Sequence, residues 1–108
     1  MAVTHKLKSW PEFFRPIVAG ERCHELRRND RAYQVGDIIE LNEFDPATQT
    51  FTGARCLAKI TSLTSSDVPC AVSSEALNPQ FCILSIHVTS FTAVNESSGQ
   101  ELTGKSVT

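Results

Sequence analysis

Charged side chains recur at a fixed spacing after Gly20. Arg22, Glu25 and Arg27 follow it in the pattern Gly-x-basic-x-x-Glu-x-Arg. Glu25 and Arg27 are two positions apart, so on a β-strand their side chains point to the same face. There a carboxylate can accept from the amino group of a base, and a guanidinium can bind phosphate or stack on a base. Such a face could hold a nucleotide-like ligand, and an exposed ion pair worth roughly 0–1 kcal/mol would produce the same pattern.

Basic residues around this pattern could extend the site. Lys8, Arg28 and Arg31 could bind the phosphate backbone of a nucleic acid through contacts that weaken as the salt concentration rises. Each of them could equally be a solvated surface side chain. The predicted RNA-binding residues are therefore Lys8, Arg22, Glu25, Arg27, Arg28 and Arg31.

Two aromatic side chains, Trp10 and Tyr33, are candidates for stacking on unpaired bases. Such a contact is worth about 1–3 kcal/mol per base. Trp10 directly follows a serine that could begin a helix. We therefore expect Trp10 to pack the start of that helix onto the barrel rather than to stack on a base.

The charge of the chain is divided unevenly. The formal net charge is only −2, so the overall charge does not indicate a nucleic-acid partner. Residues 1–31 nevertheless hold seven basic and four acidic side chains, whereas residues 32–108 hold three and eight. This division could place one positive face on an acidic body, as in nucleic-acid-binding proteins. A solvated surface of mixed charge explains it equally well.

The spacing of cysteines and histidines argues against a metal site. The four cysteines contain no Cys-x-x-Cys pair, and the three histidines show no ligand spacing. Cys23 and His24 would point to opposite faces of a strand, so they could not act together as nucleophile and base. We predict no metal, no cofactor, and free thiols in a reducing compartment.

Hydropathy gives no sign of a membrane segment. No run of about 18 apolar residues is present, which predicts that no helix spans a membrane. The N-terminal residues carry charges and lack the apolar stretch of a secretory signal. A cytoplasmic protein is therefore expected. A monomer is also predicted.

A helix is predicted between Ser9 and Gly20. The segment Ser-Trp-Pro-Glu that begins at Ser9 has the spacing of a capping box, in which the serine and glutamate side chains bind backbone N–H groups of the first turn. Gly20 can adopt the left-handed conformation that ends a helix. Pro16 removes a backbone hydrogen bond, so a bent or partly 3₁₀ helix that runs to about Ala19 is expected.

Alternating or apolar segments predict the strands, at residues 4–8, 22–28, 37–44, 53–63 and 81–88. A short helix is expected near Ser74 within the 64–80 connection. Together they predict one α+β domain over residues 1–88, a small β-barrel of about five to six mostly antiparallel strands with one main N-terminal helix packed against it. Residues 89–108 are half Ser, Thr and Gly and are predicted to form a flexible C-terminal tail.

The order of these features resembles that of ASCH domains. The opening Leu-Lys-x-Trp-Pro-x-Phe-Phe segment, the helix, the charged strand after Gly20 and the Val-Gly-Asp turn at Asp37 follow one another as in that family. Residues 5–88 resemble a branch of unknown function that occurs in bacteria and their phages. The resemblance implies a PUA-like barrel, related to RNA-binding modules, with a basic cleft between the N-terminal helix and the barrel that binds RNA or a nucleotide.

Two other functions remain open. Some ASCH-like proteins are amidohydrolases that act on acylated cytidine and use a lysine, a threonine and a glutamate. Their lysine position falls on Arg22 and their threonine position on Glu25, while the glutamate aligns only loosely with Glu75. Because arginine cannot serve as a base at neutral pH, a binding module is expected rather than an enzyme. The third possibility is a phage or accessory domain that binds another protein.

Overall fold

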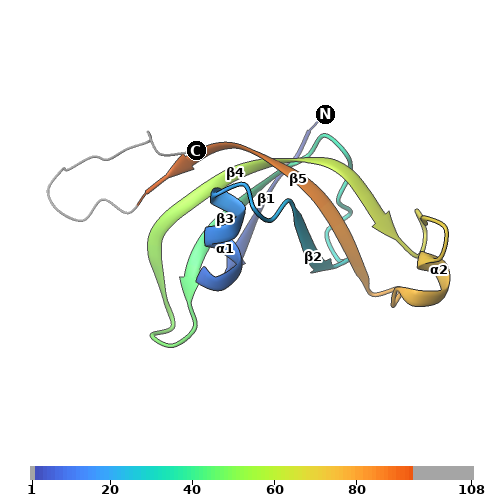
Figure 1. Ribbon diagram of the computed structural model, residues 1–108, viewed down its shortest axis with the longest axis horizontal. Helices are drawn as coiled ribbons and strands as arrows, with labels where there is room; N and C mark the ends of the chain where they lie inside the picture. Colours follow the sequence, from blue (N-terminus) through green and yellow to red (C-terminus); the bar gives the residue numbers. More distant parts are fainter. Residues whose placement is uncertain (1, 94–108) are drawn as a thin grey trace, which may run out of the picture.

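The computed structural model describes residues 2–93, and in that range it contains five strands and two helices (Figure 1). In chain order they are β1 (Thr4–Ser9), α1 (Pro11–Val18), β2 (His24–Arg28), β3 (Ile38–Asp45), β4 (Thr50–Ser65), α2 (Ser73–Ala76) and β5 (Phe81–Thr92). Every predicted strand and both predicted helices are present. Their ends differ from the prediction by a few residues.

The strands form one sheet in the order β1-β3-β4-β5-β2. β1 is parallel to β3, and the other three pairings are antiparallel. Figure 1 shows β4 and β5 as a long arch with α1 on its concave side. The α+β class and the helix packed against the sheet are confirmed. β1 and β2 are the two edges of the sheet, so the five strands form a curled half-barrel, which is consistent with the small barrel that was predicted.

Irregular pairing accompanies the curvature of the long strands. The register between β4 and β5 shifts between Leu57 and Ala58 and again between Ile60 and Ser62. Such bulges increase the local twist of a sheet and bend the bulged strand. Gly53, near the start of β4, has a φ of 99°. The bend expected at or beyond this glycine is therefore present.

The core lies on the concave face of the sheet. Ala54, Cys56, Ala58 and Ile60 are buried along β4, as the period of two predicts. The helix α1 adds two buried apolar side chains, Phe14 and Ile17. Burial of each such side chain contributes about 1.5–3 kcal/mol, which is what holds this eight-residue helix in place.

The start of α1 differs from the predicted capping box. The N-cap residue is Trp10, and no side chain caps the helix there. Ser9 is the last residue of β1 and pairs with Glu43 of β3, so its backbone belongs to the sheet. Its side chain is buried. The backbone carbonyl of Trp10 instead accepts from the N–H groups of Phe13 and Phe14, at 2.9 and 2.8 Å.

Gly20 adopts the left-handed conformation that was predicted to end the helix, with a φ of 82°. The helix is α-helical through Val18, so the expected 3₁₀ character is absent from it. The Pro16 carbonyl accepts from the N–H groups of Glu21 and Arg22, at 2.8 and 3.1 Å. These bonds close a tight turn directly after the helix.

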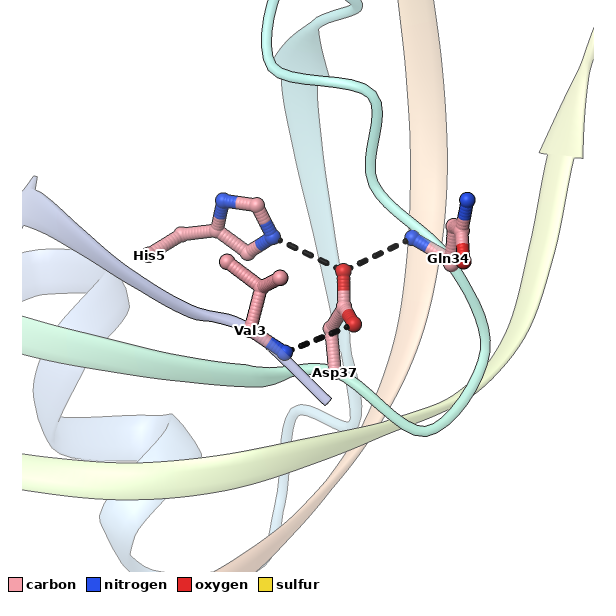
Figure 2. Close-up of polar contacts among 4 residues, drawn as sticks. All are labelled: Val3, His5, Gln34 and Asp37. Carbon is pink, nitrogen blue, oxygen red and sulfur yellow. Dashed lines mark hydrogen bonds and ion pairs between the residues drawn. The ribbon is translucent and has the colours of Figure 1, made fainter. Parts of the chain in front are cut away.

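The Val-Gly-Asp turn joins the N-terminal strand to β3 through Asp37 (Figure 2). The Asp37 carboxylate is buried and accepts from the backbone N–H groups of Val3 and Gln34, both at 3.1 Å. It also accepts from His5 Nε2 at 2.9 Å. The hydrogen bond from His5 lowers the pKa of the Asp37 carboxyl, and it outweighs the opposing effect of burial. The turn itself requires Gly36, whose φ is 98°.

The predicted domain boundary at Val88 falls inside β5, which continues to Thr92. Its last residues pair with β4, where Thr92 lies opposite Arg55. Residues 94–108, the greater part of the predicted flexible tail, lie outside the described residues. Within residues 2–93 no helix is long and apolar enough to cross a membrane.

Candidate functional site

A hollow of about 440 Å³ lies where the end of β1, the start of α1 and β2 meet. This is the place at which a cleft between the helix and the sheet was expected. Its walls are formed by Lys8, Ser9, Trp10, Phe13, Arg22, Glu25, Leu26 and Arg27. Four of the six predicted site residues therefore meet here.

Glu25 forms part of the buried floor of this hollow. It lies opposite Leu84 of β5, so its side chain turns toward the concave face and is only 5% exposed. Its Oε2 accepts a hydrogen bond from Arg27 Nε at 2.7 Å. Because the two residues are two positions apart on β2, their side chains share a face, and they form the ion pair that was the alternative interpretation of the spacing. Within the described part of the chain, the other carboxylate oxygen, Oε1, has no partner.

Three buried polar atoms of the described residues lack a hydrogen-bond partner, and all three belong to residues that line this hollow. They are Ser9 Oγ, Arg22 Nε and Glu25 Oε1. A buried polar group without a partner costs about 1–3 kcal/mol, so such groups are rare in folded proteins. Their convergence on one hollow marks a place where a polar ligand would supply the missing partners.

Aromatic side chains form the rim of the hollow. Trp10 is 47% exposed and stacks on Phe13, which is 39% exposed, with ring centroids 6.3 Å apart. The Arg22 guanidinium lies over the Phe13 ring, 5.0 Å from its centroid. The prediction that Trp10 packs the helix onto the barrel is therefore wrong, because this side chain stays largely on the surface. The inner face of α1 is already filled by Phe14 and Ile17.

Arg27 joins the two edges of the sheet. Besides its bond to Glu25, its guanidinium donates to the backbone carbonyl oxygen of Lys8. Lys8 belongs to β1 and Arg27 to β2, which are not paired with each other. We call the line along which these two edges face each other the seam. Arg27 is thus both a wall of the hollow and the contact across the seam.

A second hollow, of about 630 Å³, lies beside the first. Its walls are Lys6, Leu7, Lys8, Arg27, Arg31, Glu40, Asn42, Phe51, Gly53 and Ala54. Lys8 and Arg27 line both hollows, so the two hollows adjoin at the contact across the seam. The predicted site residue Arg31 belongs to this second hollow and not to the first.

Two predicted residues lie elsewhere. Arg28 points to the opposite face of β2, where its guanidinium lies 5.1 Å from the centroid of the Phe81 ring, outside both hollows. Tyr33 is 5% exposed and contacts the His5 ring edge to face, at 4.7 Å between centroids. Burial also raises the pKa of its hydroxyl. Tyr33 is therefore a core residue and cannot be a stacking platform.

The three positions that the resemblance to amidohydrolases indicated do not lie together. Arg22 and Glu25 line the first hollow, but Glu75 is an exposed residue of α2, which packs on β4 at the far end of the arch (Figure 1). No cluster of three or more His, Cys, Asp or Glu side chains that could hold a metal occurs within residues 2–93. Cys23 is exposed and Cys56 and Cys82 are buried, all three as free thiols.

The sequence-based prediction missed Ser9, Phe13 and Leu26. A signal for Ser9 was available, because alternation along β1 places it on the same face as His5 and Leu7. The capping-box interpretation obscured this signal. Phe13 belongs to the apolar stripe of α1 by its spacing, but it is 39% exposed and lies beside Arg22.

Residues 4–86 match the family described as "Domain of unknown function (DUF3850)". The chain belongs to this family. The matched segment includes every residue that lines the two hollows. The site described above is therefore part of the DUF3850 domain itself.

One curated relative of this DUF3850 domain is the "Uncharacterized 12.9 kDa protein in GpA 3'region" of Escherichia phage P2. The two are 34% identical over 64 residues, which are 59% of this chain and 57% of the phage protein. The chain thus spans little more than half the length of that relative. The predicted relationship to a branch of unknown function in bacteria and phages is confirmed.

A solved structure with a similar fold is that of the S128A mutant of ZmASCH from Zymomonas mobilis. The TM-score is 0.53 at 14% sequence identity, and the match covers 78% of this chain and 67% of that chain. At this identity the likeness concerns the fold alone. It confirms the ASCH-like fold of this DUF3850 domain.

Proposed function

We propose that this DUF3850 domain is a binding module that holds a base of RNA, or of a free nucleotide, in the hollow beside α1. The observation that carries the proposal is the convergence of three unpartnered polar atoms, on Ser9, Arg22 and Glu25, in one hollow. The ASCH-like fold supports it, because ASCH domains are related to the RNA-binding modules of the PUA-like superfamily.

The floor of the hollow complements the edge of a base that carries an amino group. Glu25 Oε1 can accept from the amino group, and Arg22 Nε can donate to a neighbouring ring nitrogen or carbonyl. The Ser9 hydroxyl can do either. Cytosine, adenine and guanine present an amino group and uracil does not. The site should therefore bind cytidine, adenosine and guanosine nucleotides more tightly than uridine nucleotides.

The rim can hold the flat face of the base. Trp10 and Phe13 expose aromatic surface beside the polar floor, and the Arg22 guanidinium adds a charged plane. Stacking of a base on an aromatic side chain is worth about 1–3 kcal/mol and depends little on the identity of the base. The rim and the polar floor would thus both contribute to affinity, and Glu25 would determine the choice of base.

Binding can be measured by the fluorescence of Trp10, because it is the single tryptophan of the chain and lies in the wall of the hollow. We expect CMP, AMP and GMP to change its fluorescence on binding, with UMP the weakest ligand. Glu25→Gln keeps the shape of the side chain and removes its charge. It should weaken CMP binding by about 10- to 100-fold, because a hydrogen bond to a charged group is worth about 1.5–3 kcal/mol.

Glu75→Gln is the matched control, since this carboxylate is exposed on α2 and lines neither hollow. It should leave CMP binding unchanged. Equal losses in the two variants, or no binding of any nucleotide or RNA by the wild-type protein, would contradict the proposed site. Release of cytidine from N4-acetylcytidine by the pure protein would instead favour the amidohydrolase.

A further inference from the structure

The second hollow differs from the first in the balance of its charges. Its walls carry four cationic side chains, Lys6, Lys8, Arg27 and Arg31, and one carboxylate, that of Glu40. Glu40 Oε2 already accepts from Asn42 Nδ2 at 3.1 Å. Arg27 is neutralised by Glu25, but the other three cations have no comparable partner.

The two lysines are available to an anion. Within the described residues, neither Lys6 nor Lys8 has a carboxylate oxygen within 4.0 Å of its amino group. Arg31 is 3.9 Å from Asp30, and both side chains are about half exposed, so this contact is weak. Two lysines without an ion pair and a weakly paired arginine around one hollow suit the phosphate groups of a ligand.

An aromatic surface accompanies these cations. Phe51 is 55% exposed in the wall of the second hollow and contacts Phe44 edge to face, at 5.0 Å between centroids. Lys8 Nζ lies 4.4 Å from the centroid of the Phe44 ring and 6.0 Å from that of Phe51. The second hollow thus repeats the combination found at the first, which is an exposed aromatic ring beside a cation.

We infer that the ligand is a single strand of nucleic acid and not a free nucleotide, and that it runs across the seam. One base would occupy the first hollow, a later base of the same strand would stack on Phe51, and the phosphates between these two nucleotides would contact Lys6, Lys8 and Arg31. Lys8 and Arg27 line both hollows, so the path is continuous. The inference rests on the base site proposed above. It adds that the ligand is a polymer and that it crosses from the first hollow to the second.

The test compares CMP with a ten-nucleotide RNA rich in cytidine, and with DNA of the same sequence, by titration of Trp10 fluorescence at several salt concentrations. The RNA or the DNA should bind at least tenfold more tightly than CMP, and the tighter of the two identifies the natural sugar. The logarithm of the affinity should fall with the logarithm of the salt concentration, with a slope of about 0.7 for each phosphate contacted.

Three variants test whether Lys6, Arg31 and Phe51 contact the bound strand. Lys6→Ala and Arg31→Ala should each weaken oligonucleotide binding by fivefold or more and reduce the salt slope by about 0.7, while CMP binding stays within twofold of the wild type. Phe51→Ala should weaken oligonucleotide binding alone. Lys59→Ala is the matched control, because this exposed lysine of β4 lines neither hollow, and it should change neither affinity.

The outcomes separate the two proposals. If CMP binds but the oligonucleotides bind no more tightly, or if Lys6→Ala and Arg31→Ala behave like Lys59→Ala, the strand path is wrong and the base site stands. If heparin binds as tightly as the RNA and Phe51→Ala has no effect on RNA binding, the second hollow is a general anion site and the strand path is again wrong. If neither CMP nor any oligonucleotide binds, the base site itself is wrong.

Discussion

The guanidinium of Arg27 donates to the backbone carbonyl of Lys8 and thereby connects the two open edges of the curled sheet. No backbone ladder joins β1 to β2, so this side chain takes the place of a strand pairing. The same guanidinium holds Glu25 at 2.7 Å. One residue therefore determines both the width of the seam and the orientation of the buried carboxylate.

Removal of Arg27 should destabilise the protein through Glu25. In Arg27→Ala the Glu25 carboxylate, 5% exposed, would be left buried without its counter-ion, and such a loss costs about 3–5 kcal/mol. The second change Glu25→Leu, made in that variant, should recover most of the loss because it removes the isolated charge. Urea unfolding measures both. A double variant no more stable than Arg27→Ala would show that the ion pair is not the cause, and Lys59→Ala should stay within about 0.5 kcal/mol of the wild type.

Asp37→Ala should loosen the N-terminal strand. It removes the acceptor of the Val3 and Gln34 N–H groups and of His5, and buried donors left without partners cost about 1–3 kcal/mol each. We expect a loss of about 3 kcal/mol in the free energy of unfolding. Hydrogen exchange should also accelerate at the Ile38 amide, which donates to the Val3 carbonyl. Asp67→Ala, on the exposed connection, is the control and should change neither quantity.

The same carboxylate predicts how stability depends on pH. The pKa of Asp37 is lowered in the folded protein, chiefly by the hydrogen bond from His5, from an ordinary value of 3.8. Its contribution is therefore fully present above about pH 4 and is lost as the pH falls through the folded-state pKa, because the unfolded chain binds the proton more readily there. Urea unfolding between pH 5 and pH 2 should show a smaller loss of stability in Asp37→Ala than in the wild type. Equal slopes would contradict the assignment.

Gly20→Ala should cost about 1–2 kcal/mol through the backbone alone. The φ of Gly20 is 82°, and an added Cβ would meet no atom within 4 Å, so steric overlap with neighbouring residues does not contribute. The cost is that of placing an L-residue in the left-handed region, which is about 1–2 kcal/mol. Gly20→Asn should be milder, because asparagine tolerates this conformation. Thermal unfolding of the two variants measures the order, and a larger loss in Gly20→Asn would contradict it.

The thiols should differ in reactivity according to burial. Desolvation raises the pKa of the Cys56 thiol to about 12 and also raises that of Cys82, so neither forms the reactive thiolate near neutral pH. Cys23 is exposed. Alkylation with iodoacetamide followed by peptide mapping should modify Cys23 in the native protein, and Cys56 and Cys82 only after urea is added. Early modification of Cys56 would show that β4 opens locally.

Much of the local structure was predictable because it depends on neighbouring residues. The left-handed turn at Gly20, the short helix near Ser74 and the alternation along β4 follow from backbone preferences and from the period of two. The shared face of Glu25 and Arg27 follows from the same period and is confirmed by their 2.7 Å contact. These features needed no knowledge of what packs against them.

The start of α1 shows where such reasoning fails. The Ser-Trp-Pro-Glu spacing is a valid capping signal, but pairing of Ser9 with Glu43 on β3 draws the serine into the sheet and turns its hydroxyl toward the hollow. Trp10 then becomes the N-cap residue and stays 47% exposed. A contact with a residue 34 positions away along the chain outweighed a local preference worth about 1 kcal/mol.

The sequence by itself determined the family, the elements and four of the residues that line the first hollow, Lys8, Arg22, Glu25 and Arg27. Only the tertiary structure decided that Arg28 lies outside both hollows, that Arg31 belongs to the second, and that the sheet stays open at the seam. The physical reason is that β1 pairs with β3 and β2 with β5. Which edges face each other therefore depends on packing between segments distant in the chain, and residue spacing carries no information about it.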